Sequence, residues 1–250
     1  MEANIFGTPI FMWLIAFVAI IILGVSKGGI KGISVILVTM LVYVYGGRTS
    51  TGVLMPLLIA ADLMAITYYR KNVRWKFLGK MLPAMVIGVL VGTYIGKDLP
   101  EDLFKQAMIA IIIFSVLILL YWEKYPPKQI PDNWFFSSAM GLAAGVTTMI
   151  GNLAGPFANI YFLSMRLPKN EFIGTVAWLF FMINIFKLPI HIFYWKSVNS
   201  ESILQSFSLI PALLTGFTLG AWLATKIKDH WYRKMVIGAT GIVALLLLFK

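Results

Sequence analysis

Apolar residues run along this chain in long continuous stretches, separated by short polar or glycine-rich segments. A membrane-spanning helix needs about 20 consecutive apolar residues, because the hydrocarbon core of a bilayer is about 30 Å thick. The stretches that meet this requirement cover residues 50–69, 77–96, 103–121, 170–194, 203–225 and 232–249. An outer-membrane barrel would instead give strands of about ten residues with alternating polarity. The pattern therefore predicts an all-α integral membrane protein.

Shorter apolar segments form two further pairs, and glycine-rich sequence interrupts each pair. The first pair lies within residues 9–45 and the second within residues 134–165. The second member of each pair has 13 apolar residues, which reach only about 20 Å as a helix. We therefore expect each pair to be a re-entrant hairpin that enters and leaves the membrane on one side. Two full crossings are the alternative.

The two short pairs occupy equivalent places because the chain carries an internal repeat. Gly24 corresponds to Gly145 at an offset of 121 positions, and Asp62 corresponds to Asn184 at an offset of 122. The same order continues at an offset of 128, where Pro83, Gly88 and Gly92 match Pro211, Gly216 and Gly220. Order and spacing agree over most of the chain, which favours a true repeat, and accidental matching of glycine and proline in apolar sequence is the alternative.

The repeat divides the chain into two five-segment halves, residues 1–125 and residues 126–250. Each half holds one short pair and three long spans, so it crosses the membrane an odd number of times. The second half is therefore expected to be inverted relative to the first. Inverted-topology repeats are typical of secondary transporters, which bind their substrate near the midplane at interrupted helices.

Composition and charge fit this architecture. Hydrophobic residues make up 60% of the chain and charged residues only 12%, against about 25% charged residues in soluble domains. These values exclude a soluble enzyme, a disordered chain and a disulfide scaffold, and the absence of cysteine excludes thiol chemistry.

The net charge of +11 is expected to lie in cytoplasmic loops rather than to bind nucleic acid. Thirteen basic residues fall on one predicted side and five on the other, which predicts both termini outside the cytoplasmic (inner) membrane.

The segment 24–32 combines four glycines with two lysines between two apolar pieces. Glycine permits close backbone approach, so that backbone amides can point at an anion. Lysine within the hydrocarbon is costly unless it faces water or a partner. We predict that this segment binds the substrate through Ser26, Lys27, Gly28, Gly29 and Lys31. An ordinary cytoplasmic loop with two lysines is the alternative interpretation.

The matching segment of the second half carries neutral hydrogen-bonding residues instead of lysines. We predict that Thr147, Thr148, Gly151 and Asn152 bind the same substrate, with Asn152 standing where Lys31 stands in the first half. Hydroxyl and amide groups can donate to anion oxygens without adding charge. Helix–helix packing through small and hydroxyl residues is the alternative interpretation.

Asp62 is the one acidic residue deep within a predicted long span. A carboxylate inside the membrane is a functional candidate by default, because burying it is costly. We expect Asp62 either to pair with Lys27 or Lys31 or to carry a proton that couples transport. A fixed structural ion pair is the alternative.

A second group of polar residues follows helical spacing in the span 170–194. Asn184, Lys187 and His191 lie one turn apart and form a candidate secondary pathway. Snorkelling of Lys187 to the membrane surface is the alternative for that residue.

Several of these residues resemble the motifs of a known family. The elements concerned are the segment 24–32, Pro56-Leu57-Leu58, Ala61-Asp62, Gly88-Val89-Leu90-Val91-Gly92 and, in the second half, Gly151, Gly155 and Pro156. Together they look like the TauE/SafE sulfite exporter family. The resemblance implies passage of sulfite or an organosulfonate such as sulfoacetate across the cytoplasmic membrane, and substrate binding at the matching residues.

We predict a secondary transporter that exports a small sulfur oxyanion by alternating access, with one hairpin moving against the other. Its expected partners are the lipid bilayer and the anion. One alternative is an uncoupled anion channel with the same site. The other is an intramembrane enzyme or assembly factor that uses Asn184, Lys187 and His191. The sequence has no hydrolase, metalloprotease or P-loop motif, so we expect no enzymatic activity, metal or cofactor.

Overall fold

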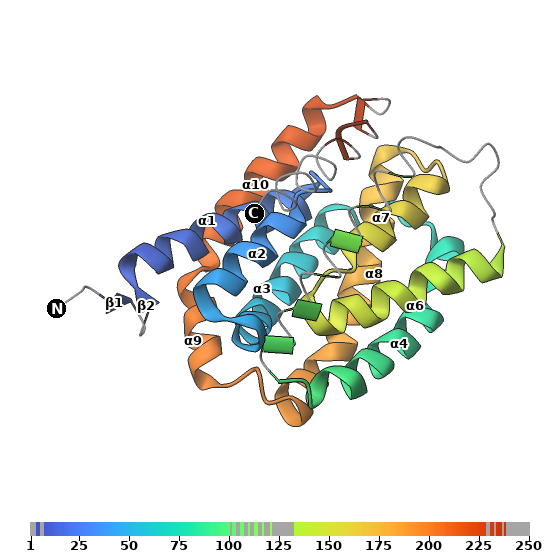
Figure 1. Cartoon of the computed structure of the whole chain (residues 1–250). Helices are drawn as coiled ribbons and strands as arrows, with labels where there is room; N and C mark the ends of the chain where they lie inside the picture. The colour runs from blue at the N-terminus through green and yellow to red at the C-terminus, as the bar shows by residue number, and fades with distance from the viewer. Residues whose placement is uncertain are drawn as a thin grey trace.

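The computed structural model describes residues 4–5, 8–100 and 133–228, with single positions between 102 and 121 and between 231 and 238. Helices make up nearly all of the described residues, and they pack side by side (Figure 1). The predicted all-α membrane class is confirmed by these long apolar helices. The spans predicted at 103–121 and 232–249 lie largely outside the described residues.

The helices follow the predicted segments closely. The first half contributes α1 (Ile10–Gly28), α2 (Ser34–Tyr45), α3 (Gly47–Tyr68) and α4 (Trp75–Lys97). The second half contributes α6 (Trp134–Gly151), α7 (Gly155–Ser164), α8 (Lys169–Pro189), the π-helix η1 (Ile190–Tyr194), α9 (Ser200–Ser208) and α10 (Ile210–Lys226). A small antiparallel hairpin, β1 (Asn4–Ile5) and β2 (Thr8–Pro9), precedes α1 and was not predicted. In the described part of the chain, α1, α3, α4, α6 and the continuous α8–η1 helix are long and apolar enough to cross a membrane.

Each interrupted pair contains one long and one short helix. α1 and α6 have 19 and 18 residues, whereas α2 and α7 have only 12 and 10. At 1.5 Å per residue the short helices reach about 15–18 Å, well below the thickness of the hydrocarbon core. The second members are thus short, as predicted, and with 12 and 10 residues they are somewhat shorter than the 13 that the sequence predicts. α1, however, continues to Gly28, into the segment 24–32 that the sequence predicts as the interruption of the pair.

Glycines let α1 and α10 pack backbone against backbone, which explains why α1 stays helical there. A methyl group at Gly24 would lie 2.5 Å from the carbonyl oxygen of Leu213, and one at Gly28 would lie 2.5 Å from that of Phe217. No side chain fits in such a contact, so these glycines serve close helix packing. Gly24 lies beside Leu213 and Gly28 lies beside Phe217, so residue numbers rise in the same direction along both helices. α1 and α10 are therefore parallel.

α6 and α4 pack in the same way at the positions that the repeat relates to α1 and α10. A methyl group at Gly141 would lie 2.5 Å from the carbonyl oxygen of Met81, and one at Gly145 would collide with that of Met85. The order of these contacts makes α6 and α4 parallel as well. In both cases, a helix of one half therefore packs on a helix of the other half.

The span predicted at 203–225 is divided into α9 and α10, which meet at Leu209 with a bend of 49°. Pro211 causes the break, because proline lacks the N–H that would continue the helix and its ring clashes with the preceding turn. α9 begins at Ser200, where the side chain of Asn199 accepts a hydrogen bond of 2.8 Å from the backbone N–H of Ser202.

Two buried cores divide the described helices into two groups. The first bundle consists of α1, α2, α3 and α10, and the second bundle consists of α4, α6, α7 and α8. Each bundle therefore contains one interrupted pair together with a packing helix from the other half. α3 and α8 meet at the centre of the molecule, where the bundles face one another (Figure 1).

Candidate functional site

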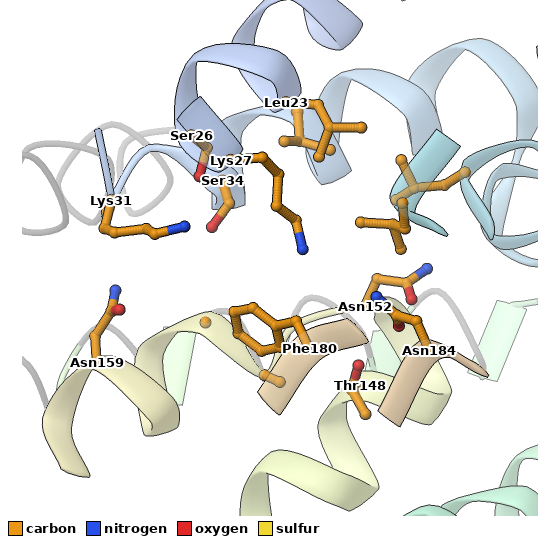
Figure 2. Close-up of a pocket in the computed structure, with 16 residues that line it drawn as sticks. Leu23, Ser26, Lys27, Lys31, Ser34, Thr148, Asn152, Asn159, Phe180 and Asn184 are labelled. Atoms are coloured by element: carbon orange, nitrogen blue, oxygen red, sulfur yellow. The ribbon is translucent and has the colours of Figure 1, made fainter. Parts of the chain in front are cut away.

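A small cavity, which we call the central cavity, lies between the two bundles (Figure 2). Its polar lining consists of Ser26, Lys27, Lys31, Ser34, Thr148, Asn152, Asn159 and Asn184. Its volume is about 50 Å³, and one water-sized sphere takes about 10–15 Å³ of such volume. The central cavity thus has room for about four non-hydrogen atoms, which is the size of a small oxyanion.

Lys31 faces the central cavity from the loop between α1 and α2. The residue is only 4% exposed, and Figure 2 shows its ammonium end reaching over the cavity, with Asn159 of α7 on the opposite wall. Within the described ranges, its Nζ has neither a hydrogen-bond acceptor nor an ion-pair partner. A buried ammonium group without an acceptor is costly. The position is therefore suited to an anion that enters the cavity.

Lys27, in contrast, already has a counter-charge. Its Nζ lies 2.5 Å from Oδ1 of Asp62, and both residues are buried. The same ammonium group lies 4.6 Å from the centre of the Phe180 ring across the cavity, within the range of a cation–π contact. Lys27 and Asp62 therefore form a neutral pair at the wall of the cavity.

Asp62 also connects the two bundles through Asn184 of α8. Nδ2 of Asn184 donates to Oδ2 of Asp62 at 2.7 Å, which joins the two residues that the repeat pairs. Lys187 continues the network, because its Nζ donates to the carbonyl oxygen of Thr148 at 2.9 Å and to Oδ1 of Asn152 at 2.6 Å. Lys187 has 0% exposure, so it does not snorkel. A polar network thus runs from one bundle into the other.

Asn152 presents an unused donor at this network. It follows α6 with a φ of 55°, a left-handed conformation that asparagine tolerates. Its Oδ1 accepts from Lys187, and an ammonium group can only donate, so Nδ2 is fixed on the other side of the amide. In the described structure this Nδ2 is buried and has no hydrogen-bond partner. The amide therefore keeps a donor that the described residues do not use.

The site carries an excess of positive charge. Among the described residues, its buried ionisable groups are Lys27, Lys31, Lys187 and Asp62, so three ammonium groups face one carboxylate. When all four are ionised the excess is two positive charges, and water is too scarce here to screen them. The described residues contain no group of three His, Asp or Glu side chains that would hold a metal ion. The chemistry offered is that of cationic and amide donors to an anion.

A comparison with protein-family models matches residues 12–247 to the family described as Sulfite exporter TauE/SafE. The match covers nearly the whole chain. The chain belongs to the TauE/SafE sulfite exporter family. No curated protein and no solved structure matches it. Together with the long apolar helices, the family assigns the chain to multi-pass membrane transporters of sulfite and related sulfur anions.

The predicted site residues of this TauE/SafE protein fall into two groups. Those that line the central cavity are Ser26, Lys27, Lys31, Thr148, Asn152 and Asn184, whereas Gly28, Gly29, Thr147 and Gly151 do not line it. Gly28 instead accepts a hydrogen bond of 2.6 Å from the hydroxyl of Tyr69, and Gly29 ends α1 with a φ of 138°. The Thr147 hydroxyl donates to the backbone of its own helix. These residues shape the elements behind the cavity wall.

His191 lies apart from the rest of the predicted polar stripe. Its Nδ1 is 2.8 Å from the hydroxyl oxygen of Ser197, and its ring contacts that of Trp195. It does not line the central cavity, whereas Asn184 lines it and Lys187 joins the network behind it. Of the three residues of the stripe, only Asn184 therefore lines the central cavity.

Among the residues that line the TauE/SafE cavity, sequence reasoning did not single out Ser34, Asn159 or Phe180. Asn159 and Phe180 stand in largely apolar helices. A usable signal existed for Ser34, which the offset of 121 relates to Gly155. A methyl group at Gly155 would lie 3.1 Å from the Ser34 hydroxyl oxygen, so the two repeat-related positions meet across the cavity.

Proposed function

We propose that this protein exports a small sulfur oxyanion, sulfite or an organosulfonate, as a secondary transporter, with Lys31 supplying the main positive charge of its site. The observation that carries the proposal is the buried Lys31 ammonium group, which faces a cavity of oxyanion size and has no acceptor in the described part of the chain. Asn152, whose Nδ2 has no partner among the described residues, and Ser34 belong to the same lining. An oxyanion in the cavity would neutralise the Lys31 ammonium group and accept hydrogen bonds from Asn152 and Ser34.

Asp62 is proposed as the coupling group. In its ionised form it holds Lys27 in a neutral pair, which keeps that ammonium group away from the anion. A proton on Asp62 would cancel the attraction and free Lys27 to face the anion. Anion binding and proton binding would then favour each other, as reciprocal coupling between two ligands requires.

The proposal includes an inverted repeat with two re-entrant hairpins and halves at 1–125 and 126–250. The first hairpin is supported by contacts near its ends. The indole N–H of Trp13 in α1 donates to Ser208, and the nearby Ser206 donates to Val53 in the first turns of α3. A single residue, Gly46, separates the end of α2 from the start of α3. The first hairpin thus starts and finishes at the end of the molecule where α3 begins.

The second hairpin starts and finishes at the opposite end. The hydroxyl of Ser137, near the start of α6, donates to the hydroxyl of Tyr161 in α7, and Tyr161 donates to the carbonyl oxygen of Phe77 at the start of α4. Hairpins that enter from opposite ends and meet at one cavity support the inverted arrangement. We place the α3 start outside the cytoplasmic membrane, in keeping with the distribution of basic residues.

Alternating access would require the bundles, each with its hairpin, to move against each other, and a matched contact joins them at each end. Arg48 at the start of α3 donates to the carbonyl oxygens of Gly96 and Lys97 at the end of α4. Lys169 at the start of α8 donates to those of Ala224 and Ile227 at the end of α10. Arg48 and Lys169 are related by the repeat offset of 121. Opening one end would break one of these contacts and keep the other.

The test is sulfite flux into proteoliposomes that contain purified protein. Lys31→Gln should lower the rate at subsaturating sulfite by about tenfold or more, since a buried charge-assisted contact is worth about 1.5–3 kcal/mol. Lys226→Gln, which removes an exposed lysine at the end of α10, is the matched control and should leave the rate unchanged. Equal rates for Lys31→Gln and wild type would overturn the role of Lys31. Single-channel conductance in a planar bilayer would favour the uncoupled channel.

A further inference from the structure

A second hollow lies at the end of the molecule where α3 begins and α4 ends. Its volume is about 360 Å³, and its lining includes Arg48, Lys97, Lys196, Asp98, Tyr194 and Trp195. Three cationic side chains and one carboxylate give the lining a net positive charge of two. The hollow shares no residue with the lining of the central cavity.

Arg48 forms hydrogen bonds to the carbonyl oxygens that would otherwise repel an anion from this hollow. The last carbonyl oxygens of α4 point out of the helix end and carry partial negative charge. Nη2 of Arg48 donates to the carbonyl oxygens of Gly96 at 2.9 Å, Lys97 at 2.7 Å and Leu99 at 2.5 Å. The helix end is thereby capped, and the first turn of α3, which carries Arg48, adds the positive end of its own dipole.

Lys97 and Lys196 supply charge that nothing in the described part of the chain neutralises. The ammonium group of Lys97 lies 3.8 Å from the centre of the Tyr194 ring, a cation–π contact that leaves its N–H donors free for an acceptor. Neither lysine has a hydrogen-bond acceptor or an ion-pair partner among the described residues, and Asp98 forms no ion pair with them.

The backbone around Lys196 is held in place before any ligand arrives. Lys196 has a φ of 54°, which is unusual for a residue with a long side chain. The N–H groups of Ser197 and Val198 both donate to the carbonyl oxygen of His191, and the His191 ring contacts the Ser197 hydroxyl. These contacts close the π-helix η1, an element that often marks functional positions. These contacts fix the backbone of Lys196 in its strained conformation.

We propose that the second hollow binds an oxyanion of the sulfite or phosphate type between Lys97 and Lys196. The proposal goes beyond transport through the central cavity and does not depend on Lys31. Two sources share this chemistry, namely a free oxyanion on its way to or from the transport path and the phosphate of an anionic lipid. The exposed aromatic rings of Phe193 and Tyr194 beside the hollow suit the level of lipid headgroups.

Trp195 lines the hollow and offers a local signal for the test. The chain has eight tryptophans, so protein labelled with 5-fluorotryptophan gives resolvable fluorine NMR lines, and Trp195→Phe identifies the line of Trp195. The labelled protein in maltoside detergent is titrated separately with sulfite, inorganic phosphate and short-chain phosphatidylglycerol. We expect a saturable shift of the Trp195 line with at least one of them.

The double variant Lys97→Gln/Lys196→Gln should weaken the apparent affinity about tenfold, because it removes two exposed charge contacts, each of which contributes modestly to binding. The double variant Lys71→Gln/Lys226→Gln, which removes two exposed lysines elsewhere, and Lys31→Gln should both leave it unchanged. Saturation by sulfite or phosphate identifies a free oxyanion as the occupant, and saturation by the lipid alone identifies a headgroup. If none of the three solutes shifts the line, or if the Lys97→Gln/Lys196→Gln variant responds like wild type, the second hollow is not an oxyanion site.

Discussion

At the scale of single residues, the three buried lysines differ in whether their ammonium groups have a partner. Lys27 has a carboxylate, Lys187 has neutral oxygen acceptors, and Lys31 has no acceptor among the described residues. Burying a charge is tolerated when partners replace the lost water, so Lys27 and Lys187 are satisfied within the protein. Lys31 is the residue whose charge awaits a ligand.

The ion pair gives a prediction about coupling. In proteoliposomes, an inward proton gradient should drive sulfite accumulation by the wild type, because a proton on Asp62 releases Lys27. Asp62→Asn cannot change its charge, so it should lose accumulation under the gradient and keep downhill exchange. The measurement is the ratio of sulfite inside to outside with and without the gradient.

The double variant Lys27→Gln/Asp62→Asn serves as the control for this prediction. It removes both partners, so it separates the loss of the proton site from the cost of an unpaired buried lysine. Accumulation by Asp62→Asn at the wild-type level would show that Asp62 is a structural partner only.

Much of the central cavity was predictable from the sequence, because charge inside an apolar stretch is conspicuous. Lys27, Lys31 and Asp62 stood out in this way, and the repeat offset led from Lys31 to Asn152. Asn159 was not predictable, since a lone amide in a short apolar helix is equally compatible with helix packing. The sequence could not tell which lysine keeps an ammonium group without a partner. That depends on the distances between helices, and the periodicity of a sequence carries no information about those distances.

At the scale of helices, glycine contacts decide how the elements pack. Gly24 in α1 and Gly145 in α6 occupy repeat-related positions and touch the backbones of α10 and α4. The apolar runs at 50–69, 77–96 and 170–194 correspond closely to α3, α4 and the α8–η1 helix, whereas the run at 203–225 is broken at Leu209. The sequence predicted an interruption at 24–32 that begins too early, because glycine signals a loop and a tight helix contact equally well.

These contacts predict a matched loss of stability in the two halves. Gly24→Ala and Gly145→Ala should each lower the free energy of unfolding by about 1–3 kcal/mol, because the added methyl group has no space. Gly79→Ala in α4 is the control, since nothing lies within 4 Å of the added methyl group there. It should be neutral or stabilising by about 0.5–1 kcal/mol. Thermal unfolding in detergent measures all three, and equal midpoints for the three variants would contradict this packing.

At the scale of the whole molecule, the chain forms two interlocked bundles with polar groups at the interface between them. Each bundle takes α10 or α4 from the other half, and Arg48 and Lys169 join the bundles at opposite ends. The sequence predicted two related halves, but it did not predict that packing helices are exchanged between them. In both halves the exchanged contact is made by glycines that lie against the backbone of the partner helix.

The central claim is that an oxyanion binds in the central cavity beside Lys31. Selenite has the shape and charge of sulfite, and selenium can be located by its anomalous X-ray scattering in crystals of the protein. We predict a selenium peak between the bundles, within hydrogen-bonding reach of Nζ of Lys31 and Nδ2 of Asn152. An empty central cavity at saturating selenite, or a peak only in the second hollow beside Lys97, would contradict the account.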